Sequence, residues 1–154
     1  MKPEDGLKKL EQYAKSLQEA QTKVVAVGLP MEKAGSKVYG DGESVISVGA
    51  QHEYGINGMK ERSFLRLPFS IKNAEILTMT QRQFNQVFER GRSVDKALGL
   101  LGITATNISK GAFTSKGYGQ WADISQATKE KKGSSQVLID TGILRGSITF
   151  VVRG

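Results

Sequence analysis

Two short segments hold side chains that could do chemistry. One is Asp140-Thr141-Gly142, which follows two apolar residues. An aspartate there could hydrolyse peptides if a second carboxylate lay about 3 Å away, because such a pair shares one proton and supplies both base and acid. The other is His52-Glu53, in which a metal-binding imidazole would stand beside a general base.

Asp-Thr-Gly is also the catalytic sequence of pepsin-like and retroviral aspartic proteases. In that family a flap hairpin and a further apolar segment follow the triplet, whereas only twelve residues follow Gly142 here. A turn explains the triplet instead. Asp140 can accept hydrogen bonds from the backbone N–H groups that follow it, and Gly142 permits the turn. Leu144 then enters the core ahead of a C-terminal strand, so the sequence favours a cap and predicts no catalytic residue.

The composition argues against metal and cofactor sites. The chain has no cysteine and a single histidine, His52, which excludes thiolate sites and sites built from several histidines. HEYG also lacks the second histidine, four residues on, that a zinc-protease helix requires. No phosphate-binding loop or dinucleotide fingerprint is present. We therefore expect no metal, no cofactor and no enzymatic activity.

Charge is unevenly distributed along the 154 residues, whose net charge is +7. Residues 78–154 hold eleven Lys and Arg against five Asp and Glu, whereas residues 1–77 are nearly balanced. A basic half is typical of proteins that bind nucleic acid or an acidic protein. Tyr118 and Trp121 could stack on bases, but we expect them to be packing residues. A small basic nucleic-acid-binding domain is thus the alternative function.

Hydrophobic periodicity predicts the elements that would position these residues. An N-terminal helix is expected over residues 1–21, with Leu7, Leu10 and Leu17 on its apolar face and Asp5 as its N-cap. The further predicted elements are strands over residues 23–30, 45–55 and 147–153, and helices over residues 71–90 and 94–112.

The two long helices carry predictions of their own. The first should place Ile71, Ala74, Leu77, Phe84 and Phe88 on its apolar face and end at Gly91. Gly99 and Gly102 lie inside the second and cost about 1 kcal/mol each relative to alanine. They indicate close approach of another backbone, or a bend.

Together these elements predict one domain, residues 1–154, of the α+β class. The N-terminal helix would precede a core over residues 22–154. That core should hold a small mixed or mainly antiparallel sheet with helices packed on one face. Long flexible loops are predicted at residues 31–44, as a hairpin connection between two strands, and at residues 113–136.

Four segments follow one another in a particular order. The turn HEYG leads into the basic-aromatic ERSFLRLPF and a long helix; later Trp121 precedes DISQATKEKKGSS, and LIDTGILRGSI closes the pattern. This order resembles the tail-completion or neck proteins of tailed bacteriophages and prophages, a family of virion-morphogenesis and minor tail components. Ser63 departs from the pattern, since the family often has proline there. The matching residues singled out are His52, Glu53, Tyr54, Gly55, Phe64, Leu65, Arg66, Trp121, Asp140, Thr141, Gly142, Leu144 and Ser147.

The resemblance implies a non-enzymatic structural role. Such proteins form a ring that completes the tail or joins it to the head connector, so a homo-oligomer, hexameric in the assembled particle, is expected. The implied partners are the head–tail connector or stopper and the tail-tube or tail-terminator proteins, with DNA passing through the lumen. The expected location is the virion neck or tail, after synthesis in the bacterial host cytoplasm. No apolar run approaches the length of a membrane span.

Overall fold

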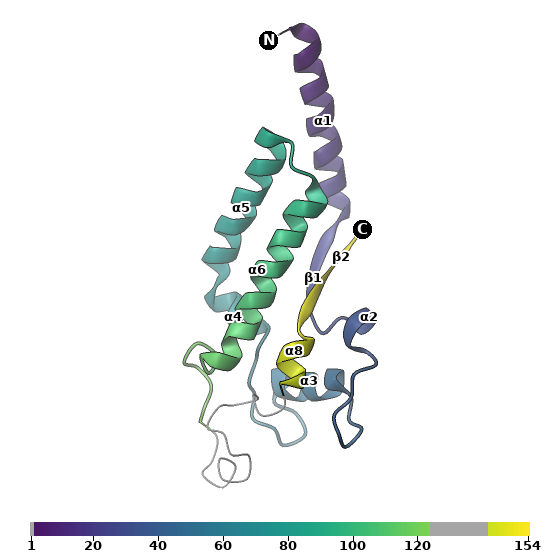
Figure 1. Cartoon of the computed structure of the whole chain (residues 1–154). Coiled ribbons are helices and arrows are strands. Elements are labelled where there is room, and N and C mark those ends of the chain that lie inside the picture. The colour runs from purple at the N-terminus through teal and green to yellow at the C-terminus, as the bar shows by residue number, and fades with distance from the viewer. Residues whose placement is uncertain (1, 124–141) are drawn as a thin grey trace.

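A computed structural model of the protein describes residues 2–123 and 142–154. A two-stranded sheet lies beside a pair of long helices, and the N-terminal helix extends past the end of that pair (Figure 1). The elements are α1 (Pro3–Thr22), β1 (Val24–Gly28), α2 (Met31–Ala34), α3 (Val45–Tyr54), α4 (Arg66–Ile71), α5 (Asn73–Arg90), α6 (Val94–Thr114), α8 (Ile143–Ser147) and β2 (Thr149–Arg153).

The sheet joins two distant parts of the chain. β1 pairs antiparallel with β2, in a register that sets Val24 opposite Arg153 and Gly28 opposite Thr149. α6 packs across both strands, and α5 packs against α6. The predicted α+β class, with a small antiparallel sheet and helices packed on it, is confirmed.

α1 starts earlier than its predicted cap. The prediction of Asp5 as N-cap is wrong, because the helix begins at Pro3 and Lys2 occupies the cap position. Proline suits the first helical position, where its missing N–H would have had no partner in the helix. Asp5 instead lies in the first turn with Glu4, where a negative charge interacts favourably with the positive end of the helix dipole.

The strand predicted over residues 45–55 is wrong, since this segment forms α3. Ser44 caps the helix by accepting hydrogen bonds at Oγ from the N–H groups of Ile46 and Ser47. Two of its buried positions hold Gly49 and His52. Neither residue type counts as apolar when hydrophobic periodicity is read from a sequence. The remaining valines and alanine then alternate like a strand, and a short apolar run does not distinguish the two structures.

The prediction of a hairpin connection over residues 31–44 is also wrong, because no strand follows this segment. The segment joins β1 to a helix, and β1 pairs with the C-terminal strand instead. It opens with α2 and carries a single antiparallel bridge between Val38 and Ser44. In the predicted loop 113–136, the first two residues belong to α6, and residues 124–136 lie outside the described part of the chain.

The predicted helix that ends at Gly91 is broken at Lys72, which separates α4 from α5. Gly91 ends α5 in the left-handed conformation, at φ 67°, as predicted. The predicted apolar face is confirmed at Phe84 and Phe88, which pack against a buried cluster, and is wrong at Ile71, Ala74 and Leu77, which are exposed. Val87 is buried on α5.

α6 begins where the sequence predicts. The Ser93 Oγ accepts a hydrogen bond from the Lys96 N–H at 3.3 Å and so caps the helix. The close approach predicted for the two glycines occurs at Gly102 alone, where a Cβ would overlap the ring of Phe150 on β2. The approaching group is a side chain and not a backbone. Gly99 faces open space.

Two hydrophobic clusters hold these elements together. The first lies where α3, α6 and α8 meet, and the second lies between α5 and α6, with the side chains of Val25 and Val152 from the sheet packed against it. The buried members of the first cluster are Val45, Phe64, Ala112, Phe113, Trp121, Leu144 and Ile148; those of the second are Val87, Val94, Ala97 and Leu98.

Candidate functional site

The carboxylate of Glu53 binds several of the residues that carry the family resemblance. Glu53 stands near the end of α3 and is only 3% exposed. Its Oε2 accepts hydrogen bonds from the backbone N–H groups of Phe64 (2.8 Å) and Leu65 (3.0 Å). Its Oε1 accepts from Ser63 Oγ (2.7 Å), from the Arg66 backbone N–H (3.0 Å) and from Arg66 Nε (3.1 Å). These bonds hold the start of α4 against the end of α3, because N–H groups that open a helix have no partner within it.

Arg66 covers this carboxylate on the solvent side. Its Nη2 donates to the Glu53 carbonyl oxygen (2.6 Å) and to Glu61 Oε1 (2.9 Å). Its guanidinium lies 4.6 Å from the centre of the Tyr54 ring, a cation–π distance. The hydrogen bond to Glu53 raises the pKa of Arg66 above its usual value. Tyr54 and Arg66, far apart in the resemblance pattern, therefore stack on the surface above the buried carboxylate.

The turn after α3 requires glycine. Gly55 has φ 62°, and a Cβ there would come within 2.8 Å of the Glu61 backbone nitrogen. His52 is buried, and its carbonyl oxygen accepts a hydrogen bond from the Arg62 N–H at 2.7 Å. The sequence HEYG thus forms the last turn of α3 and its C-terminal cap, rather than a strand end.

Ser63 and Phe64 connect this turn to α6 and to Trp121. Ser63 Oγ accepts from the Leu67 N–H (2.9 Å), and the Ser63 carbonyl oxygen accepts from Trp121 Nε1 (3.2 Å). The Phe64 carbonyl oxygen accepts from Ser109 Oγ at 2.7 Å. Ser63, the residue that departs from the family pattern, therefore binds an N–H of the first turn of α4 through a hydroxyl that proline lacks.

The C-terminal segment of the pattern reaches the same cluster. Gly142, at φ 64°, precedes α8, and Leu144 is buried in the first hydrophobic cluster, as predicted. Ser147 is buried too and donates from Oγ to the Ile143 carbonyl oxygen (2.7 Å). Asp140 and Thr141, with the predicted cap at Asp140, lie outside the described residues.

The hydrogen bonds of Glu53 connect α3 to the start of α4. The carboxylate of Glu53 accepts five hydrogen bonds from protein groups, so its lone pairs are used within the fold. Within residues 2–123 and 142–154, no three side chains of the His, Cys, Asp or Glu type gather as metal ligands would. A bond network of this kind fixes one arrangement of α3, α4 and α6.

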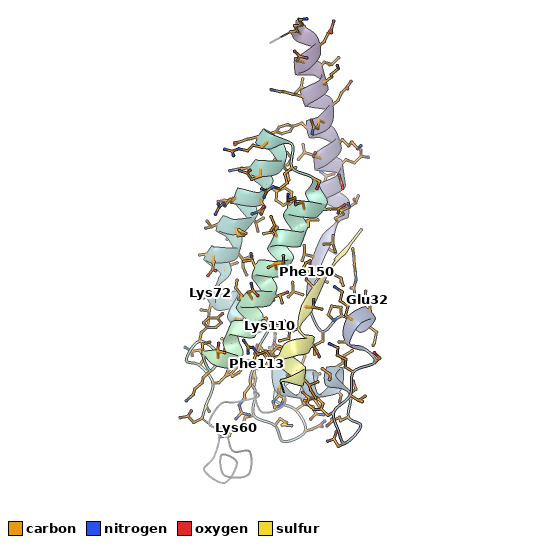
Figure 2. The ribbon with its side chains drawn as sticks, viewed as in Figure 1. Glu32, Lys60, Lys72, Lys110, Phe113 and Phe150 are labelled. Atoms are coloured by element: carbon orange, nitrogen blue, oxygen red, sulfur yellow. The ribbon has the colours of Figure 1, made fainter. Side chains whose placement is uncertain are left out.

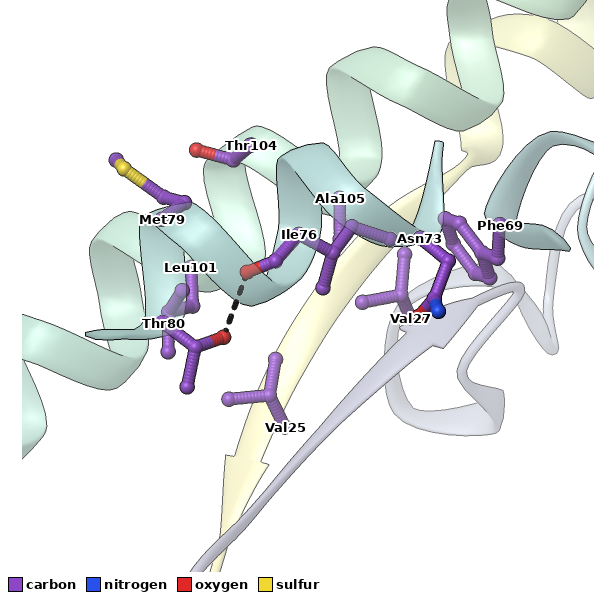
Figure 3. Close-up of a pocket in the computed structure, with 10 residues that line it drawn as sticks. All are labelled: Val25, Val27, Phe69, Asn73, Ile76, Met79, Thr80, Leu101, Thr104 and Ala105. Atoms are coloured by element: carbon purple, nitrogen blue, oxygen red, sulfur yellow. Dashed lines mark hydrogen bonds between the residues drawn. The ribbon is translucent and has the colours of Figure 1, made fainter. Parts of the chain in front are cut away.

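A separate apolar pocket of about 350 Å³ lies between β1 and the helices α4, α5 and α6 (Figure 3). Val25 and Val27 of β1 line one side, and Ile76 and Leu101 of the helices line the other. The Thr80 hydroxyl donates to the Ile76 carbonyl oxygen at 2.8 Å and is thereby satisfied within α5. None of its lining side chains is ionisable, so the pocket offers apolar contact and no acid or base.

The predicted packing role of the two candidate base-stacking residues is confirmed. Trp121 is buried against Phe113, and the Tyr118 hydroxyl donates to the Ile108 carbonyl oxygen at 2.8 Å. Burial raises the pKa of Tyr118. Several basic side chains form ion pairs on the protein surface. These pairs are Lys23 with Glu19 and Asp95, Lys72 with Glu75, Lys116 with Asp123, and Arg153 with Glu32.

The sequence pattern of α1 did not reveal that its apolar face is open. No side chain of α1 is buried, and the N-terminal end of the helix extends beyond the other elements (Figure 2). Leu7, Leu10 and Leu17 are 61%, 68% and 45% exposed. We call these three residues the leucine stripe. An apolar helix face has the same sequence pattern whether it packs in the core of its own chain or is left for another molecule. Periodicity alone could therefore not distinguish these two cases.

Within the part of the chain that the structure describes, no helix has the length and hydropathy that crossing a bilayer requires. Comparisons of the chain with protein-family models, with curated proteins and with solved structures found no match. The resemblance to phage tail-completion proteins therefore remains a prediction, resting on the sequence pattern.

Proposed function

We propose that the chain is a non-enzymatic structural component of a phage or phage-like tail, where it completes the tail or joins it to the head connector. One observation carries this proposal. The residues that make up the resemblance come from separate parts of the sequence. Phe64, Leu65 and Arg66 bind the Glu53 carboxylate, and Phe64, Trp121 and Leu144 share the first hydrophobic cluster. A motif whose members hold one another in place is expected of a family defined by a shape rather than by a reaction.

The mechanism proposed is assembly by complementary surfaces. Each copy presents one patch to the next copy, and a rotation that closes turns these heterologous contacts into a ring. Six copies are expected from the symmetry that the resemblance implies. The connector on one side and the tail tube or terminator on the other would then each meet a ring with the same symmetry.

Deletion of the gene from the phage or prophage that encodes it tests this function. We expect filled heads and separate tails by electron microscopy, and no infectious particles. Wild-type protein supplied from a plasmid should restore joined particles, and the Glu61→Gln variant, which alters an exposed carboxylate, should restore them equally. Infectious particles without the gene would refute the proposal.

A measurement on purified protein tests the assembly mechanism. Light scattering over a range of concentrations, with and without the tail-tube protein, should give a hexamer, or a ring that needs that partner. The nucleic-acid alternative predicts instead a complex with DNA whose affinity falls steeply with salt. A monomer that ignores the tail tube but binds DNA in this way would favour the alternative.

A further inference from the structure

The two edges of the sheet differ in how they are covered. At the edge of β2, Lys33 Nζ of α2 donates to the Phe150 carbonyl oxygen at 3.0 Å, and Arg153 forms an ion pair with Glu32 of the same helix. Proteins commonly protect a sheet edge with a lysine or with a covering helix. β1 contains no charged residue and no proline, so its own edge lacks these protections.

The contact of Lys33 shows which backbone groups of β1 point outward. In an antiparallel pair, residues alternate between exchanging both hydrogen bonds with the partner strand and directing both groups away from it. The Phe150 carbonyl is directed away from β1, because it accepts from Lys33, and Phe150 stands opposite Val27. Val27 and Val25 therefore direct their N–H and C=O groups outward. Within the described residues, no hydrogen bond reaches these groups.

The apolar pocket lies along this open edge (Figure 3). The sheet residues that line it, Val25 and Val27, both belong to β1, and α5 and α6 form the other side. Thr80 and Thr104 contribute hydroxyls, but each hydroxyl donates to a carbonyl oxygen of its own helix. A segment beside β1 would thus meet unpaired backbone groups along one side and apolar side chains from the helices.

We infer that the open edge of β1 binds an extended segment of another protein, which adds a strand to the two-stranded sheet. Main-chain hydrogen bonds supply the affinity of such strand addition, and pockets for alternate side chains supply its specificity. The segment runs antiparallel to β1, as β2 does, because antiparallel pairing is slightly more stable per residue than parallel pairing.

This geometry determines the chemistry of the segment. Its residues opposite Val25 and Val27 point the same way as those side chains, into the pocket. They should be apolar, since a charge buried there would have no partner. The residues between them point to the other face of the sheet, where Val24 is 60% exposed, and are therefore free to be polar. The expected partner segment alternates apolar and polar residues.

A second copy of this chain does not supply such a segment from its described residues. Its two strands are already paired with each other, so it offers only its own β1 edge. Pairing of two β1 edges would also bring α5 of both copies to one seam. The inference goes beyond the proposed function and does not depend on it, because it rests on the strand edge and the pocket alone.

Amide hydrogen exchange of the full-length protein, measured by NMR, tests the open edge. In the free protein the Val25 and Val27 amides should exchange about tenfold faster than the amide of Ala26, whose N–H points toward β2. A synthetic peptide of alternating valine and threonine is then added at millimolar concentration. It should slow exchange at Val25 and Val27 severalfold and leave Ala26 unchanged.

Two N-methylated forms of this peptide are matched controls, since they keep the side chains and each lose half of the N–H donors. Methylation at the valines, whose N–H groups would face β1, should abolish the protection. Methylation at the threonines, whose N–H groups would point away, should preserve it.

Substitutions in β1 test the same contact from the side of the protein. Val27→Pro removes an outward N–H that the pairing with β2 does not use, so circular dichroism should show a retained fold. The peptide should then no longer protect Val25. Val27→Ala keeps the N–H and should still respond. The two methylated peptides decide the question even if Val27→Pro fails to fold.

Other results would overturn the inference. Slow exchange at Val25 and Val27 in dilute free protein would mean that the edge is already covered, and protection that grows with protein concentration would indicate pairing between copies. Equal protection by both methylated peptides would reduce the site to apolar contact without strand pairing. Protection by neither the unmodified peptide nor its methylated forms would exclude strand addition at this edge.

Discussion

At the scale of single residues, Glu53 shows how burial decides the role of a carboxylate. Beside His52 in the sequence it resembles part of a metal or acid–base site, and its position in the chain does not exclude that. In the fold it accepts hydrogen bonds from the N–H groups that open α4 and from Ser63 and Arg66. A group that satisfies so many donors is expected to matter for stability.

The first prediction is that Glu53→Gln destabilises the protein by about 3 kcal/mol, because the amide NH2 would face N–H donors and leave Arg66 without its buried partner. Urea denaturation measures the change in free energy of unfolding. Glu61→Gln is the matched control, since Glu61 also contacts Arg66 but is exposed; it should cost less than about 1 kcal/mol. Equal effects of the two substitutions would contradict the assigned role of Glu53.

The second prediction concerns Ser63, where this chain departs from the family pattern. Ser63→Ala removes the acceptor of the Leu67 N–H and one donor to Glu53, so a loss of about 2 kcal/mol is expected. Ser70→Ala, an exposed change on the same helix, should stay within about 0.5 kcal/mol. A Ser63→Ala protein as stable as Ser70→Ala would show that the two hydrogen bonds of the Ser63 hydroxyl are dispensable.

At the scale of elements, the sequence predicted what local patterns can carry. α6 follows from a long apolar period with Ser93 at its start, and α5 ends at Gly91 as predicted. α3 was missed because two of its buried positions hold glycine and histidine. Gly49 is small there because Leu29 approaches it, and that contact exists only in the folded chain.

The third prediction separates the two glycines of α6. Gly102→Ala should cost about 1–3 kcal/mol, because the new methyl group would overlap the Phe150 ring and push β2 away from the helix. Gly99→Ala should instead stabilise the protein by up to about 1 kcal/mol, since its position is open and alanine favours a helix. Thermal denaturation of both variants checks this, and a stabilising Gly102→Ala would contradict the packing of β2 on α6.

At the scale of the whole molecule, the pairing of β1 with β2 could not be predicted from either strand. β1 is recognisable as a β-branched run and β2 as an alternating strand, but nothing in residues 24–28 specifies residues 149–153 as their partner. The same holds for the contacts made by the residues of the resemblance. Phe64 and Trp121 belong to that pattern, but only the fold brings Trp121 to the carbonyl oxygen of Ser63 and Ser109 to that of Phe64.

The fourth prediction follows from the leucine stripe, which the sequence located and the fold left open. If the stripe serves association and not the fold of one chain, the double change Leu7→Gln and Leu10→Gln should alter the free energy of unfolding of dilute protein by no more than about 0.5 kcal/mol per site. Leu144→Ala, in the first hydrophobic cluster, should cost about 2–5 kcal/mol as the buried control. A stripe variant that unfolds as readily as Leu144→Ala would mean that α1 stabilises the single chain, and its leucines would then need no other molecule to explain them.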